Sequence, residues 1–383
     1  MYRVRLNMED YTIPQREVVL VGHPFVPIGM GEHLRCSFRA FRSVGVKIGV
    51  RDIYGMKYDD PDVEKEIGQY IIRDLSREIN IFHINANEVE QSLEHLGGSL
   101  PSGAYNVIYP MWELSRYPEV WAEQLNKFDE VWAGSKFTCE SIRSAVRNPV
   151  IHMPVAGEVA LSTFLGRRYF KIPESSFAFL FFFDFTSYIQ RKNPFAVFQA
   201  FEGLCKNCPN QDLFLVIKFK GGETRQKDCE MFADYIARYK NRVLVIDNVL
   251  KDNEIRNLVR CCDCFVSLHR SEGVGLGLSA AMFMGKPVVA TGYSGNLDFM
   301  TENNSCLVRY DLCPVPDGAY PFSEGQVWAE PDTAHAVDQM LKLVSDRDYA
   351  RELGERASRD IRVNFSYRAT GLRYLDRIRE IAG

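Results

Sequence analysis

The sequence lacks a long apolar segment and a dominant charge of either sign. Its longest uninterrupted apolar run, Phe177–Phe183, has seven residues, whereas a helix that spans a membrane needs about 20. The N-terminal stretch lacks the basic and then apolar pattern of a signal peptide. With 46 basic and 50 acidic residues the net charge is −4, so no overall basic field favours nucleic acid as a partner. We therefore expect a cytoplasmic protein, or one that rests on the inner face of a membrane, and no nucleic-acid partner.

Two further patterns are missing. Ten cysteines in a 383-residue chain without an export signal do not make a disulfide framework, so we expect reduced thiols. The glycine pattern G-x-G-x-x-G of dinucleotide-binding enzymes does not follow the first apolar run at Val18–Gly22, and no acidic residue stands at the expected ribose position. These absences argue against a secreted disulfide-rich protein and against a dinucleotide-dependent enzyme.

What the sequence does contain is a regular alternation of short apolar runs and longer amphipathic segments. In the first half the expected helices include Glu32–Arg42 and Ser135–Val146. The expected strands are Val18–Gly22, Lys47–Val50, Ile79–Ile84, Tyr105–Tyr109, Glu130–Ala133 and Val150–His152. This rhythm predicts a parallel sheet covered by helices.

A second series of the same kind follows a weakly periodic linker from Pro154 to Pro173. Its expected strands are Phe177–Phe183, Leu213–Lys218, Val243–Ile246, Cys264–Leu268 and Pro287–Ala290. Its expected helices are Phe195–Gly203, Asp228–Tyr239, Asn253–Arg260 and Leu276–Met284. We therefore predict an α/β protein with two Rossmann-like doubly wound domains, residues 1–160 and 161–350, facing across a ligand-binding cleft. Helices over 351–383 are expected to pack back towards the N-terminal domain.

The window 264–300 carries the most specific chemistry. A strand ends near Leu268, and glycines at 273, 275 and 277 lead into a helix. Glycines let the backbone approach a ligand, and a helix N-terminus favours an anion such as a diphosphate. Glu272 is an unusual charge to find beside phosphate, so we expect it to contact sugar hydroxyls instead.

This window resembles the retaining GT-B glycosyltransferases of glycosyltransferase family 4. Their signature is a glutamate, a glycine-rich turn, a second glutamate eight positions after the first, then Ala-Met and Gly-x-Pro-Val-Val. Here Glu272 is followed by Gly273-Val-Gly-Leu, Ala281-Met and Gly285-Lys-Pro-Val-Val. The resemblance implies transfer of a sugar from a nucleotide diphosphate-sugar to a hydroxyl of a glycan or lipid-linked acceptor, with retention of configuration. It also implies that Glu272 contacts the donor sugar and that a run of backbone groups holds the distal phosphate, namely Gly273, Val274, Gly275, Leu276 and Gly277.

One position departs from the signature. The second glutamate, which grips the nucleotide's ribose in the family, is Ala280 here. The change implies weaker ribose binding, a deoxyribose donor such as a dTDP-sugar, or lost activity. We favour an active enzyme with altered ribose contacts, and the alternative is a catalytically silent GT-B domain that binds a nucleotide sugar or glycan as a partner subunit. Look-alikes that build bacterial surface polysaccharides favour mannose or rhamnose as the sugar.

A second candidate site follows the strand at Phe177–Phe183. Arg191 and Lys192 lie in the next loop, and their charges suit a diphosphate leaving group. The alternative is two solvated charges at a helix start. Lys218, at the end of the next strand, is a further donor-binding candidate. The resemblance implies no metal and no cofactor, because the paired aspartates of the other large glycosyltransferase fold are absent and basic residues take their place.

The remaining candidates stand at other strand ends. Gly31 follows the first strand in a glycine-rich loop that resembles the family's first phosphate-facing loop, although a plain turn would look the same. His83 stands where the family often has a histidine at the sugar site; the alternative is a structural histidine. Other residues expected at the cleft are Trp112 and Glu113 on the acceptor side, and His269, Arg270 and Asn296 on the donor side.

Overall fold

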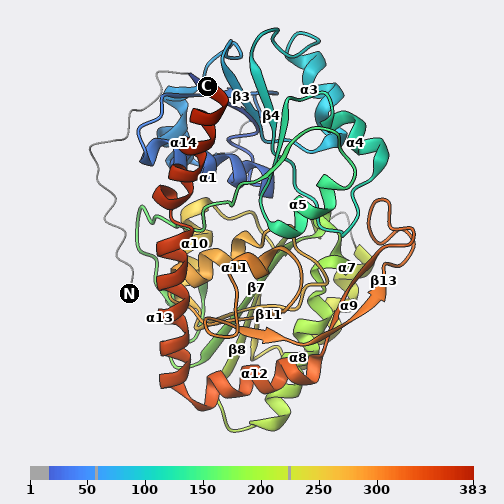
Figure 1. The fold of residues 1–383 in the computed structure, drawn as a ribbon. Coiled ribbons are helices and arrows are strands. Elements are labelled where there is room, and N and C mark those ends of the chain that lie inside the picture. Colours follow the sequence, from blue (N-terminus) through green and yellow to red (C-terminus); the bar gives the residue numbers. More distant parts are fainter. Residues whose placement is uncertain (1–16, 57–58, 223–225) are drawn as a thin grey trace.

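The computed structural model describes residues 17–56, 59–222 and 226–383. The N-terminal stretch compared above with a signal peptide therefore lies outside the described residues. Two α/β domains stand one above the other, and two long C-terminal helices run along one side of both (Figure 1). Among the described helices, none is both long and apolar enough to cross a membrane.

The first domain is a six-stranded parallel sheet in the order β2-β1-β3-β4-β5-β6. Its strands are β1 (Val18–Gly22), β2 (Ile48–Asp52), β3 (Ile79–Phe82), β4 (Tyr105–Ile108), β5 (Glu130–Ala133) and β6 (Val150–His152). Its helices are α1 (Gly29–Ser43), α2 (Pro61–Ile67), α3 (Val89–His95), α4 (Glu119–Leu125) and α5 (Lys136–Arg143). All five residues of β1 are buried, as expected for a parallel strand covered on both faces.

The second domain has another six-stranded parallel sheet, in the order β12-β11-β10-β7-β8-β9. Its strands are β7 (Phe177–Asp184), β8 (Leu213–Lys220), β9 (Val243–Ile246), β10 (Cys264–Ser267), β11 (Val288–Thr291) and β12 (Cys306–Val308). Helix α6 (Arg167–Phe170) precedes the sheet. The helices within the domain are α7 (Ile189–Lys192), α8 (Pro194–Asn207), α9 (Gln226–Arg238), α10 (Asp252–Cys261), α11 (Leu276–Phe283) and α12 (Thr333–Ser345). Numbered from the first strand, this is the doubly wound order 3-2-1-4-5-6 reversed.

The fold class predicted from the sequence is confirmed. Each expected strand is present, and where a strand end differs from the prediction it does so by one or two residues, because apolar runs mark buried strands more sharply than they mark strand ends. The sequence alone did not predict α2, α3, α4, α6, α7, β12 or an antiparallel hairpin of β13 (Tyr310–Pro314) and β14 (Val327–Pro331). Arg191 and Lys192, expected in a loop, lie in the short helix α7.

Two C-terminal helices complete the molecule, α13 (Arg347–Asn364) and α14 (Tyr367–Ala382). Gly354 brings α13 against the turn after α11, where an added Cβ would lie 2.0 Å from the carbonyl oxygen of Gly285. Gly371 brings α14 equally close to α1, 2.2 Å from the carbonyl oxygen of Ala40. The chain therefore crosses from the second domain back to the first between α13 and α14.

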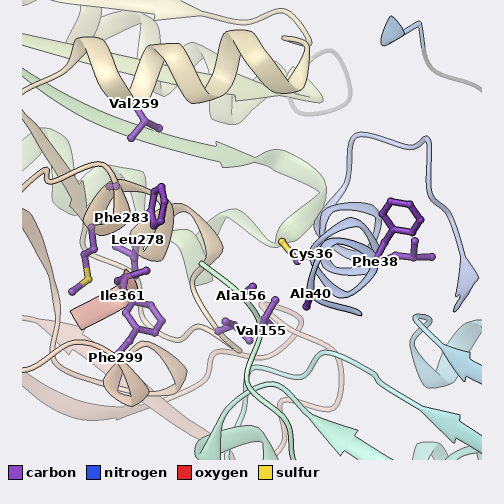
Figure 2. Close-up of a cluster of buried hydrophobic side chains, with 14 of the residues drawn as sticks. Cys36, Phe38, Ala40, Val155, Ala156, Val259, Leu278, Phe283, Phe299 and Ile361 are labelled. Carbon is purple, nitrogen blue, oxygen red and sulfur yellow. The ribbon is translucent and has the colours of Figure 1, made fainter. Parts of the chain in front are cut away.

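The domains also share apolar packing. One hydrophobic cluster includes residues of α1, of the linker and of α11 and α13. Figure 2 shows Val155 and Ala156 of the linker between Ala40 of α1 on one side and Leu278 and Ile361 on the other. Because this core is continuous, the cleft between the domains is set by packing as well as by the linker.

Candidate active site

The second sheet reverses its strand order between β7 and β10, which are hydrogen-bonded neighbours. In open α/β sheets such a switch point leaves a crevice at the carboxyl ends of the strands, and ligands bind there. The segment that follows β7 carries Arg191 and Lys192, and the segment that follows β10 carries Glu272. The topology therefore brings these three predicted residues to one place.

The three side chains form an ion cluster. Lys192 Nζ lies 2.5 Å from Glu272 Oε1, and Arg191 Nη1 lies 3.4 Å from Glu272 Oε2. Burial alone would raise the pKa of Glu272, but Lys192 and Arg191 outweigh it and lower that pKa to about 2. Burial lowers the pKa of Lys192, and Glu272 opposes this shift. The carboxylate is thus held charged between two cations.

Arg191 is held in a restrained position. It is only 3% exposed, and its Nη1 donates to the carbonyl oxygen of Ser271 at 2.9 Å. Its Nε is buried without a hydrogen-bond partner in the described part of the chain, at a cost of about 1–3 kcal/mol. Tyr188 and Asn193, which flank its short helix α7, have φ values of 62° and 50°, a left-handed conformation found often at ligand sites. An anion that accepts from Nε would relieve that cost.

The glycine-rich turn lies directly beside this cluster. Gly275 has φ +91°, which favours glycine, and it caps the N-terminus of α11. The amides of Gly273, Val274 and Gly275 donate to no other group among the residues described. Together with the first amides of α11 they can hold an anion. Gly277 has a different role: an added Cβ would lie 2.7 Å from the ring of Phe182.

The donor-side residues His269, Arg270 and Asn296 are tied into the protein. His269 Nε2 lies 3.1 Å from Asn296 Oδ1, and burial lowers the pKa of His269. Arg270 forms an ion pair with Glu330 on β14 at 2.6 Å. These contacts hold the three side chains against neighbouring parts of the second domain. That any of the three touches a donor stays a prediction.

The first domain contributes Glu113, which meets Arg191 across the domain boundary. Glu113 Oε1 lies 3.5 Å from Arg191 Nη2. Its neighbour Trp112 is 1% exposed and donates from Nε1 to the carbonyl oxygen of Arg116 at 3.0 Å. Ser135 Oγ reaches the carbonyl oxygen of Gly273 at 2.6 Å. Glu113 thus reaches the ion cluster, while Trp112 is buried in the hydrophobic cluster of the first domain.

Two other predicted residues of the first domain are enclosed by the fold. His83 has no exposed surface, and its Nδ1 atom lies 3.4 Å from Nδ1 of His33. Burial lowers the pKa of His83 well below its usual range. Gly31 lies inside the tight turn that starts α1, where an added Cβ would be 2.2 Å from the carbonyl oxygen of Val26. Neither residue lines the cavity described next.

A cavity of about 240 Å³ lies between the domains. Predicted residues Leu276 and Gly277 line it, together with Ala280, the position of the missing glutamate. Charged residues from both domains also line it, namely Glu32, Arg35, Glu158, Asp252 and Arg256. The ion cluster around Glu272 is not part of its lining, so the cavity extends from the far side of the turn.

The charged residues that line this cavity were not predicted from the sequence. Arg35 pairs with Glu32 at 2.7 Å and with Asp252 of the second domain at 3.3 Å, and Arg256 pairs with Glu32 at 3.5 Å across the domain boundary. The pairs Glu32 with Arg35 and Asp252 with Arg256 have the spacing of an exposed helical face. Nothing local distinguishes them from solvated charges.

Lys218 is buried next to this cavity. It is 5% exposed and stands opposite Phe182 in the β7–β8 register, and Phe182 lines the cavity. Burial, and then repulsion from Lys220, lower the pKa of Lys218 to about 8. Lys220 itself pairs with Asp184 at 3.1 Å.

Known proteins resemble this chain in fold and, over the second domain, in sequence. Residues 179–360 match the family described as Glycosyl transferases group 1. The structure of Anabaena HepE in complex with UDP and glucose superposes with a TM-score of 0.64 at 12% identity, over 95% of this chain and 99% of that one. Sucrose-phosphate synthase from Thermosynechococcus elongatus gives 0.65 at 13% identity, over 96% and 99%. The fold is GT-B.

Two further relatives extend the comparison. The structure of a glycosyltransferase from Rickettsia africae superposes with a TM-score of 0.62 at 15% identity, over 96% of this chain and 99% of that one. Trehalose synthase from Pyrococcus horikoshii is 25% identical over 131 residues, which are 34% of this chain and 26% of that protein. The matched part thus spans about a quarter of this curated relative. The second domain is the part that resembles group 1 glycosyltransferases in sequence, and the GT-B likeness extends over both domains.

Proposed function

We propose that this chain is a nucleotide-sugar-dependent hexosyltransferase. It moves a sugar from a nucleotide diphosphate-sugar to a hydroxyl of a glycan or lipid-linked acceptor, with retention of configuration. One observation carries the proposal: Arg191 and Lys192 lie within 3.4 Å of Glu272, at a switch point, beside the amides of residues 273–275. Had these groups lain on separate surfaces, no diphosphate site could be assembled.

The charges of the cluster suit a donor that arrives as an anion. Without a donor, Glu272 pairs with both Arg191 and Lys192, and Glu113 supplies the second negative charge. A bound diphosphate takes over both cations, because phosphate oxygens accept strong charge-assisted hydrogen bonds from them. Glu272 is then free to accept hydrogen bonds from sugar hydroxyls. The nucleoside lies in the cavity beside Ala280, where no carboxylate of α11 grips the ribose.

The chemistry then needs mainly stabilisation of the leaving group. As the bond between the sugar and the diphosphate breaks, negative charge grows on the diphosphate, and Arg191, Lys192 and the turn amides stabilise it. The leaving diphosphate takes the proton of the acceptor hydroxyl on the same face of the sugar, which retains the configuration. The reaction proposed here uses no metal and no cofactor.

The biological setting is part of the same proposal. Three of the structural neighbours were solved with UDP, and one of them also with UDP-glucose, which supports a nucleotide-sugar donor. The family 4 resemblance supports a place in bacterial polysaccharide synthesis, with mannose or rhamnose as the sugar. We place the reaction in the cytoplasm or at the inner face of the membrane, where a lipid-linked acceptor is available.

A second candidate function has one observation in its favour. Ala280 removes the carboxylate that grips ribose in the family, as expected of a silent domain that binds a nucleotide sugar or glycan as a partner subunit. Such a domain would bind nucleotide sugars without releasing a nucleoside diphosphate.

The deciding experiment measures binding and diphosphate release together, with UDP-, GDP- and dTDP-sugars. We expect release with one class of donor. Lys192→Ala and Glu272→Gln should each lower turnover by about 100-fold or more. Lys206→Ala, a change at an exposed lysine on α8, should leave turnover unchanged. Binding without release would favour the silent domain, and near-normal turnover in both site variants would refute the proposed site.

A further inference from the structure

The hairpin β13–β14 belongs to the second domain but packs on the first. The segment that joins its strands contains Tyr320, whose ring lies 5.3 Å from that of Trp112, and Phe322, whose ring lies 5.1 Å from that of Trp121. Tyr320 and Trp328 belong to the hydrophobic cluster of the first domain. The hairpin therefore bridges the two domains, on the side of the molecule opposite to α13 and α14 (Figure 1).

Polar contacts fix the register of this bridge. Gln326 Oε1 accepts from the amide of Arg116 at 3.1 Å, and Gln326 Nε2 donates to the carbonyl oxygen of the same residue at 2.8 Å. Trp112 Nε1 donates to that oxygen as well. A side-chain amide that pairs with both main-chain groups of one residue allows little sliding, so the position of Tyr320 relative to the first domain is well defined.

Tyr320 connects the bridge to the ion cluster. Its hydroxyl donates to Glu113 Oε2, and the other oxygen of that carboxylate faces Arg191 at 3.5 Å. The Arg191 guanidinium lies 6.0 Å from the centre of the Tyr320 ring, and the ring of Tyr188 lies 4.7 Å from it. Tyr320 is 7% exposed. Tyr320 thus contacts Glu113, Tyr188 and Trp112 at once.

We propose that Tyr320 is a positioning residue for the diphosphate site: its hydroxyl orients Glu113, which in turn holds Arg191. This inference rests on the proposed function. Arg191 has two carboxylate partners, Glu272 from its own domain and Glu113 from the other. When a diphosphate draws Arg191 and Lys192 away from Glu272, Glu113 is the carboxylate that keeps the guanidinium in place. The hairpin thereby makes assembly of the cation site depend on contact between the domains.

The test is a double-mutant cycle with Tyr320→Phe and Glu113→Gln. The Phe variant keeps the ring and its packing and removes only the hydroxyl. We expect kcat for diphosphate release to fall by about tenfold, the effect of losing one hydrogen bond to a charged group, while KM for the donor changes by less than about threefold. Adding Tyr320→Phe to Glu113→Gln should then cost little more, because the two residues act through one contact.

Two control variants on the same hairpin separate positioning from packing. Phe322→Ala removes the contact with Trp121 and leaves the hydroxyl of Tyr320 in place, so it should lower Tm yet keep kcat within about threefold of the wild-type value. Tyr310→Phe removes a hydroxyl from an exposed residue of β13 and should change neither quantity. Wild-type kcat in Tyr320→Phe, or losses that multiply in the double variant, would overturn the inference.

The cycle is also read in Tm, which keeps the inference separate from the proposed function. Tyr320→Phe should lower Tm by roughly 2–6 °C, and by less than half of that amount in the Glu113→Gln background. If the wild-type protein releases no diphosphate from any donor, the proposed function fails. Additive Tm shifts would then overturn the Tyr320–Glu113 link as well, and non-additive shifts would leave that link standing as a structural contact alone.

Discussion

Lys218 shows how a single residue can report donor binding. Its pKa of about 8 lies below the ordinary value of 10.5, mainly because the side chain is buried. Because the pKa of Lys218 is lower in the folded protein than in the unfolded chain, charging this lysine costs more in the folded state. The group therefore lowers the free energy of unfolding below pH 8, and this loss disappears as pH rises from 8 to 10.5. UDP bound in the neighbouring cavity would bring negative charge towards Lys218, favour its charged form and reverse the preference for the neutral form.

This reversal predicts a pH-dependent affinity. Below pH 8 Lys218 is already charged, and binding needs no proton. Above pH 8 the protein must take up a proton to bind, so UDP affinity should fall by up to about tenfold per pH unit. Calorimetric titration of UDP from pH 7 to 9.5 measures the slope, and Lys218→Met should flatten it. Equal slopes in both proteins would mean that Lys218 takes up no proton when UDP binds.

At the residue scale the sequence located side chains better than it located their partners. Arg191, Lys192 and Glu272 follow strands of the second sheet, and the structure brings their side chains together at one edge of it. The order of residues along the chain could not show that Glu272 forms ion pairs with both Arg191 and Lys192. It also could not show that Glu113 of the other domain reaches Arg191. Such partners depend on loops separated by about 80 residues or more, for which local periodicity holds no information.

At the scale of elements, the turn into α11 is the part that tolerates least change. Gly275 has φ +91°, and an added Cβ would lie 2.9 Å from Leu278 Cδ1. Gly275→Ala should therefore lower the free energy of unfolding by about 1–3 kcal/mol, measured by urea denaturation, and should weaken UDP binding because the turn amides move.

The matched control for that substitution is Gly166→Ala. Gly166 has φ −83°, and no atom lies within 4 Å of its added Cβ, so stability should stay within about 0.5 kcal/mol of the wild-type value. If Gly275→Ala matched this control in both stability and UDP binding, the turn would not have the restricted geometry described above.

The helices and the hairpin that the sequence did not predict lack an apolar pattern long enough to recognise. Helices α2, α3 and α4 have only seven residues each, too few for a clear helical period. The hairpin β13–β14 has mostly exposed residues on β13, so no apolar run marks it. A turn signal, Pro316-Asp317-Gly318, was present between its strands. Its role became visible only where Tyr320 meets the first domain.

At the scale of the molecule, α14 joins the end of the second domain to the first. Tyr374 is fully buried and donates to the carbonyl oxygen of Pro154 at 3.2 Å. Arg377 Nε lies 3.0 Å from Glu130 Oε1, and Glu130 has no exposed surface. With the shared core and the hairpin, these contacts should make the two domains unfold as one unit in the wild-type protein.

Arg377→Ala should let the two domains unfold separately. It leaves the Glu130 carboxylate buried with only neutral donors, Tyr105 and Trp132. Removing one partner of a buried pair costs about 3–5 kcal/mol, and partial exposure of Arg377 brings the expected loss to about 2–4 kcal/mol. The loss falls on the first domain and on its contact with α14, so the first domain should melt before the second.

Tryptophan fluorescence can report whether the first domain unfolds before the second. Of its four tryptophans, three lie in the first domain and Trp328 packs against it, so fluorescence reports the first domain while circular dichroism reports both. In the wild-type protein the two unfolding midpoints should coincide. In Arg377→Ala the fluorescence midpoint should come first, whereas Arg379→Ala, a change to a surface pair on the same helix, should keep them together. Coincident midpoints in Arg377→Ala would mean that the domains are coupled through the shared core and the hairpin without help from this ion pair.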